Sequence, residues 1–125
     1  DARPTYLKKV AEDYPDLKLI CAHLGGHAPF LPGRWLDEAI YLVSNSDNIY
    51  LDISALFVEE LIQKAIGEIG ADKLLFGSDY PAITGFCDHH TGLKNCVRWF
   101  ASLDIPFTAK QKIFGENARK LLGLV

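Results

Sequence analysis

Two residues that could carry out acid–base or metal chemistry each follow a short apolar run in this chain. His23 comes after residues 19–22 (Leu-Ile-Cys-Ala), and Asp79 comes after residues 74–78 (Leu-Leu-Phe-Gly-Ser). A carboxylate at the end of a hydrophobic strand is costly unless a charged group or a metal ion partners it. An imidazole exchanges protons near neutral pH. Because ligands gather at the carboxyl ends of parallel strands, we expect His23 and Asp79 to share one pocket.

Each of these residues also has a purely structural interpretation. His23 could be a histidine whose ring is satisfied by backbone at a strand end, and Asp79 could be a turn or capping aspartate ahead of Pro81. Asp52 follows another apolar run and leaves two alternatives open. It either reaches the same pocket or caps the next helix together with Ser54.

Other polar residues lie in the loops that follow the apolar runs. His27 is expected to contact substrate rather than a metal, and Arg34 either clamps a carboxylate with two hydrogen bonds or is a solvated residue at a helix start. Residues 87–90 (Cys-Asp-His-His) suggest a metal cluster, but their spacing fits no zinc template, and a polar loop over the pocket mouth is the simpler interpretation. Dinucleotide, phosphate-loop, serine-elbow and HExxH motifs are absent from the sequence.

The elements that must position these residues follow from hydrophobic periodicity and turn signals. Strands are expected over 17–22, 49–53 and 74–77, and helices over 4–14, 34–43, 58–69 and 93–103, with a last helix that is broken at 115–117. This alternation predicts an α/β fold with a parallel sheet, and the strand at 17–22 has the apolar content of one buried on both faces. Three strands leave two exposed edges, so the chain is expected to be part of a larger sheet or barrel.

The composition narrows the class of protein. The 125 residues are 49% hydrophobic and 23% charged with a net charge of −3, and they contain no cluster of basic residues, so nucleic acid is not an expected partner. No apolar run approaches the roughly 18 residues that span a bilayer, and a membrane partner is not expected either. Three cysteines without CxxC spacing indicate reduced thiols and a cytoplasmic location. Because the chain begins at Asp1 rather than Met, we expect it to be trimmed or cut from something longer.

Three segments carry a resemblance to a known family. Residues 19–26 (LICAHLGG), 75–81 (LFGSDYP) and 115–122 (GENARKLL) occur in the same order in the amidohydrolase-related metal-dependent hydrolases. This group includes aminocarboxymuconate-semialdehyde decarboxylase and related decarboxylases and lactonases. The resemblance implies that residues 1–125 form a single C-terminal portion of a TIM (β/α)₈ barrel, a partial barrel that corresponds to strands six to eight with their helices.

The same resemblance implies roles for individual residues. Asp79 falls on the aspartate that binds the divalent metal, usually zinc, and His23 falls on the histidine that acts as acid and base. Arg34 falls near an arginine that reaches a neighbouring subunit's substrate, which implies a homo-oligomer. The family's HxH pair and a further histidine ligand are absent from this chain. Because catalytic zinc needs about three protein ligands, the missing N-terminal half of the barrel is an expected partner.

The expected function is therefore that of a metal-dependent enzyme acting on a small molecule. It would hydrolyse a C–N or C–O bond of a small organic acid or ester, or decarboxylate such an acid without oxidation, and this chain alone would be inactive. One alternative is a non-catalytic half-barrel that serves as a binding or assembly module. Another is a small complete α/β enzyme in which His23 and Asp79 form a metal-free acid/base pair.

Overall fold

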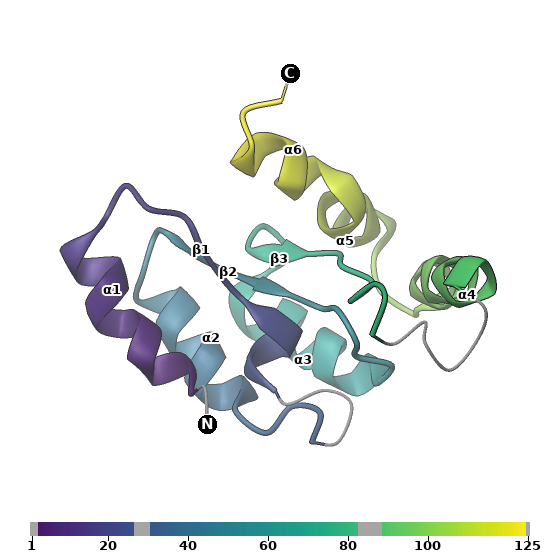
Figure 1. Cartoon of the computed structure of the whole chain (residues 1–125), viewed down its shortest axis with the longest axis horizontal. Coiled ribbons are helices and arrows are strands. Elements are labelled where there is room, and N and C mark those ends of the chain that lie inside the picture. The colour runs from purple at the N-terminus through teal and green to yellow at the C-terminus, as the bar shows by residue number, and fades with distance from the viewer. Residues whose placement is uncertain (1–2, 27–30, 83–88, 125) are drawn as a thin grey trace.

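A computed structural model of the chain describes residues 3–26, 31–82 and 89–124, with the side chains of residues 89–91 excepted (Figure 1). Its strands form one parallel sheet in the order β1 (Leu19–Cys21), β2 (Ile49–Asp52) and β3 (Leu74–Leu75). The helices are α1 (Leu7–Asp13), α2 (Leu36–Ser44), α3 (Glu59–Ile69), α4 (His89–Ser102), α5 (Phe107–Gln111) and α6 (Asn117–Leu121). The expected α/β class and parallel pairing are confirmed.

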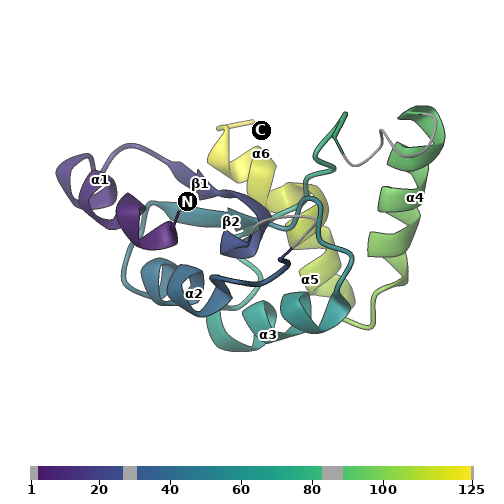
Figure 2. The same cartoon turned by 60° about the horizontal axis from the view of Figure 1, so that its bottom comes forward.

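Helices cover one face of the sheet and leave part of the other open. Helices α2 and α3 pack side by side beneath the strands in both views (Figures 1 and 2), and the side chains of Ile49, Leu51 and Leu74 are fully buried in the core. On the opposite face of β1, Ile20 is 50% exposed. The expectation that the first strand is buried on both faces is therefore wrong for this chain, because nothing in its described part covers Ile20.

The helices begin and end close to where the sequence places them. Helix α3 buries Ile62 and Ala65 and ends at Gly70, whose φ of 72° is the left-handed conformation that favours glycine after a helix. The first helix starts with a 3-10 turn at Pro4–Tyr6. The last long helix, α4, begins at His89 rather than at the expected residue 93.

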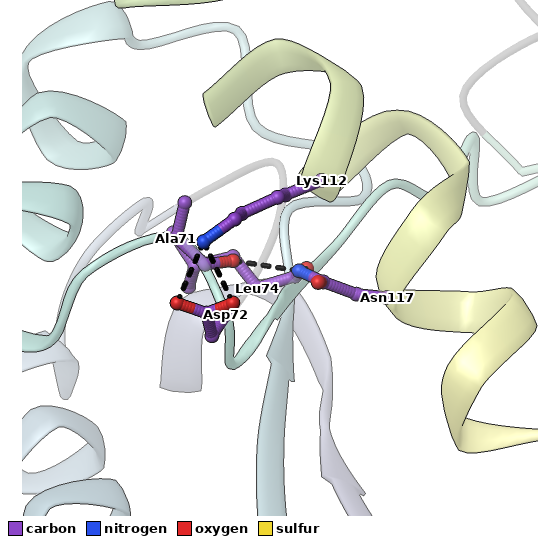
Figure 3. Close-up of polar contacts among 5 residues, drawn as sticks. All are labelled: Ala71, Asp72, Leu74, Lys112 and Asn117. Carbon is purple, nitrogen blue, oxygen red and sulfur yellow. Dashed lines mark hydrogen bonds and ion pairs between the residues drawn. The ribbon is translucent and has the colours of Figure 1, made fainter. Parts of the chain in front are cut away.

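The C-terminal helix is not broken at residues 115–117, contrary to the sequence-based expectation. A π-helical turn (Lys112–Glu116) joins α5 to α6 and lets the helix continue through Gly115. Buried Asn117 at the start of α6 donates from Nδ2 to the carbonyl oxygens of Ala71 (2.6 Å) and Leu74 (2.8 Å), as Figure 3 shows. Asn117 thereby fixes the C-terminal helix to the beginning of β3.

Two further observations concern the class of protein. Within the part of the chain that the structure describes, no helix has the length and apolar character needed to cross a membrane. Cys21 and Cys96 are both buried and unbridged, while Cys87 lies outside the described residues.

Candidate active site at the strand ends

The three strands end at the same edge of the sheet, and an unusual backbone follows each of them. His23 after β1 (φ 58°), Ala55 after β2 (φ 58°) and Asp79 after β3 (φ 54°) all adopt the left-handed conformation, although none is glycine. This conformation is disfavoured for residues with a side chain, and it is concentrated at functional sites. The edge that carries the predicted residues His23 and Asp79 is therefore the candidate active site.

Asp52 ties the end of β1 to the end of β2. Its Oδ1 atom accepts a hydrogen bond from the backbone N–H of His23 (3.1 Å), one from the backbone N–H of Ser54 (2.9 Å) and one from the Ser54 hydroxyl. The Nδ1 atom of His23 lies 2.9 Å from the carbonyl oxygen of Ser54 and 2.9 Å from its Oγ. One carboxylate oxygen thus holds both the backbone of His23 and the serine that contacts its ring.

This arrangement decides between the two interpretations of Asp52 and Ser54. Helix α3 begins at Glu59 with Val58 before it, so neither Asp52 nor Ser54 caps that helix. Sequence reasoning missed the contact between Ser54 and His23, since the two residues are 31 positions apart. The Asp-x-Ser spacing indicates a local turn but does not reveal a distant partner.

Glycines allow the backbone around this network to pack closely. Gly25 has a φ of 73°, and a Cβ atom there would lie 2.8 Å from Cβ of Ala39 and 2.9 Å from Cγ of Pro4. Its role is thus to pack the loop after His23 against α2. At Gly77 a Cβ atom would lie 3.0 Å from Cβ of Ser54, so a side chain there would press on the network.

A cavity of about 440 Å³ opens beside His23 at the β1 edge. Its lining includes Arg3, Tyr6, Ile20 and Cys21. Burial raises the pKa of the Cys21 thiol to about 11, and the negative charge of Asp52 adds to this rise. Cys21 is therefore protonated at neutral pH and is not a nucleophile there.

Asp79 is half-buried in the segment that follows β3. Its backbone carbonyl accepts a hydrogen bond from the N–H of Ala82 (2.8 Å), which closes a turn. Among the described residues, none forms a hydrogen bond or ion pair with the Asp79 carboxylate. The turn interpretation therefore explains the backbone of Asp79. It does not explain the side chain, for which the described part of the chain shows no hydrogen bond or ion pair.

The other predicted site residues are not brought to His23 by the described structure. Arg34 is exposed, and its guanidinium lies 4.8 Å from the centre of the Trp35 ring, which Arg3 also contacts at 4.3 Å. His27 lies outside the described residues, as do Cys87, Asp88 and the side chains of His89 and His90. The described residues contain no group of three His, Cys, Asp or Glu side chains placed to hold a metal ion. The described residues therefore do not provide a complete set of ligands for a divalent metal.

Comparison with known proteins gives this geometry a context. The model of the amidohydrolase family matches residues 2–124. A gamma-resorcylate decarboxylase from Polaromonas sp. is 28% identical over 126 aligned positions, which cover 90% of this chain and 36% of that protein. The chain therefore spans about a third of the length of the curated relatives it matches.

Solved structures agree with the family match. An uncharacterised TIM-barrel protein from Bordetella bronchiseptica is 30% identical with a TM-score of 0.73, and the match covers 97% of this chain and 39% of that one. The dihydroxybenzoic acid decarboxylase of Polaromonas sp., solved with manganese and the inhibitor 2-nitroresorcinol, is 27% identical with a TM-score of 0.64 over 94% of this chain and 37% of its own. The three-stranded sheet is thus part of a TIM-barrel fold, and the chain belongs to the amidohydrolase family.

Proposed function

We propose that residues 1–125 are the C-terminal portion of an amidohydrolase-type barrel that decarboxylates a hydroxybenzoate without oxidation. The observation that carries this proposal is that His23 and Asp79 both follow strands that end at the same edge of the sheet, each with a left-handed backbone. The similarity to gamma-resorcylate decarboxylases over nine-tenths of the chain favours this reaction. Hydrolysis of a C–N or C–O bond of a small organic acid or ester is the second candidate, which the amidohydrolase family match supports.

Asp79 would be one ligand of a divalent metal ion, with the others supplied by barrel residues that this chain does not contain. Zinc is the metal that the sequence resemblance implies, and manganese is the one bound in the Polaromonas enzyme. Such an ion, when bound, polarises oxygen atoms of the substrate. We expect this chain alone to be inactive, because the family's HxH pair and its further histidine ligand are absent from the sequence.

His23 would supply the proton that replaces the carboxylate on the ring and would regain a proton from solvent afterwards, with Asp79 assisting as a proton shuttle. Decarboxylation places a proton on the ring carbon that bears the carboxylate; the electron pair of the C–C bond then returns to the ring as CO₂ leaves. A correctly placed acid contributes about 10²–10⁴-fold to such a step. Arg34 and His27 would bind the substrate carboxylate. Arg34 would reach the substrate of a neighbouring subunit in a homo-oligomer. A small molecule is the expected partner. The cysteine pattern predicts a cytoplasmic location.

The test is an assay of the product of the complete open reading frame that encodes this sequence. With Mn²⁺ or Zn²⁺ added, we expect CO₂ release from 2,6-dihydroxybenzoate or an isomer. His23→Asn and Asp79→Asn should each lower the rate by about 100-fold or more, and only Asp79→Asn should also lower the metal content. Asp72→Asn is the matched control, because Asp72 pairs with Lys112 at an exposed site, away from the strand-end network.

Three results would overturn the proposal in different ways. Hydrolysis of amides, esters or lactones without CO₂ release would favour the hydrolase. Absence of both activity and bound metal would favour a binding or assembly module. Full activity of the isolated 125-residue chain would refute its dependence on further barrel residues.

A further inference from the structure

The contacts of the His23 ring determine which of its two nitrogen atoms is free to exchange a proton. A neutral imidazole carries its proton on either Nδ1 or Nε2, and the partner of one nitrogen fixes the state of the other. Here Nδ1 faces two oxygen atoms of the same residue, the carbonyl oxygen and Oγ of Ser54. The chemistry of those two oxygens settles the tautomer.

Both oxygens of Ser54 present lone pairs to the ring. A backbone carbonyl can only accept a hydrogen bond, so Nδ1 must donate to it. The hydroxyl could in principle donate its proton to Nδ1 instead, but that proton is directed to Oδ1 of Asp52. As long as Asp52 accepts the hydroxyl proton, the state with a proton on Nδ1 satisfies all three groups.

We propose that Asp52 is a positioning residue that acts through Ser54 to hold His23 as the Nδ1–H tautomer, so that Nε2 is the atom that exchanges protons. The same Oδ1 atom accepts the backbone N–H of His23 and so also supports the left-handed backbone that aims the ring. This inference rests on the proposed acid–base role of His23. It adds to that role the atom that exchanges the proton, Nε2, and the two residues that select it, Asp52 and Ser54.

The decisive experiment is NMR of the ¹⁵N-histidine-labelled 125-residue chain at a pH where imidazole is neutral. Correlations between ring carbon-bound protons and ring nitrogens distinguish a protonated nitrogen from a bare one. The chain has four histidines, and the His23 signals are those lost in His23→Gln. We expect His23 to be protonated on Nδ1 and bare on Nε2.

Variants separate the role of Asp52 from a general effect on folding. In Asp52→Ala the Ser54 hydroxyl is free to donate to Nδ1, so the ring population should shift toward Nε2–H. The double variant Asp52→Ala/Ser54→Ala removes that donor and should return to Nδ1–H, as should Ser54→Ala alone. Asp52→Asn retains an oxygen acceptor and should keep the wild-type tautomer.

The outcomes are separable from those of the proposed function. An Nε2–H ring in the wild-type chain, or an Asp52→Ala ring that stays Nδ1–H, would overturn the inference whatever the enzyme's activity. If Asp52→Ala does not fold, Asp52→Val or Asp52→Leu takes its place, since each also lacks an acceptor for the Ser54 hydroxyl, and a ring that stays Nδ1–H there would overturn the inference. An inactive protein with the expected tautomers would refute the decarboxylase and leave the role of Asp52 standing.

Discussion

Cys21 shows how one buried residue at the end of β1 is affected by the carboxylate nearby. Its side chain is 8% exposed, and burial together with the charge of Asp52 makes the thiolate unfavourable in the folded chain. The pKa of the thiol therefore rises from 9.0 to about 11. A group whose pKa is higher in the folded than in the unfolded state stabilises the fold below the unfolded value and loses that effect as the pH rises.

From this shift we predict a loss of stability in alkaline solution that depends on Cys21. The free energy of unfolding should fall as the pH rises from about 9 to about 11, because the unfolded chain releases the thiol proton before the folded chain does. Urea unfolding of the 125-residue chain across this range would measure the effect.

The control for this prediction is Cys21→Ser, whose hydroxyl does not titrate in that range. The variant should show a flatter dependence of unfolding free energy on pH. A wild-type chain and a Cys21→Ser variant with identical slopes would show that the thiol is not the titrating group.

At the scale of single residues, the sequence singles out candidate groups but does not reveal the contacts that they make. His23 and Asp79 are identifiable because a polar residue directly after an apolar run is a local pattern. The link from Asp52 through Ser54 to His23 is not local, because it depends on the pairing of β1 with β2. The left-handed backbone at His23 and Asp79 could not be predicted either, because neither residue is a glycine.

Among the elements, two buried asparagines fasten the helices to the beginnings of the strands. Asn48 donates from Nδ2 toward the carbonyl oxygens of Ala11, Tyr14 and Leu17, at 3.0–3.2 Å, and so joins the end of α1 to β1 and β2. Asn117 does the same for α6 and β3. Both lie at the edge opposite the candidate active site, so they stabilise the fold without entering the chemistry.

We predict that Asn117→Ala destabilises the chain substantially. It would leave the buried carbonyl oxygen of Leu74 without its Asn117 donor, while the carbonyl oxygen of Ala71 keeps a hydrogen bond from the backbone N–H of Leu74 (3.2 Å). One unsatisfied buried group costs about 1–3 kcal/mol, so we expect that loss in the free energy of unfolding, read as a lower urea midpoint with an unchanged slope.

A matched variant in the same segment is Lys112→Ala. Lys112 forms an exposed ion pair with Asp72 at 2.9 Å, and such pairs contribute only about 0–1 kcal/mol. Equal losses for Asn117→Ala and Lys112→Ala would contradict the role of Asn117 (Figure 3).

For the whole molecule, the order of elements and their parallel pairing could be read from the sequence because each helix and strand has its own periodicity. The continuous C-terminal helix could not, since Gly115 is a local breaker whose cost is overcome by the packing of Ile113 and Asn117 in the core region. The open face at Ile20 was not predicted either. A strand of apolar residues carries no sign of whether its second face is covered by the same chain or by another part of a barrel.

That open face yields the last prediction, which concerns the place of this chain in a complete barrel. Ile20→Asp should cost the isolated chain only about 1 kcal/mol, because the side chain is 50% exposed and the main loss is the poor strand propensity of Asp. In the product of the complete open reading frame, the same change should cost about 2–3 kcal/mol or more, since this face would then lie inside the barrel and the charge would be buried.

Thermal or urea unfolding of both proteins measures the difference, with Ile49→Asp, at a fully buried position, as the variant that should be severe in both. An Ile20→Asp effect that is equally small in the two proteins would mean that the remaining barrel does not cover this face, and the assignment of residues 1–125 to the end of a barrel would be wrong.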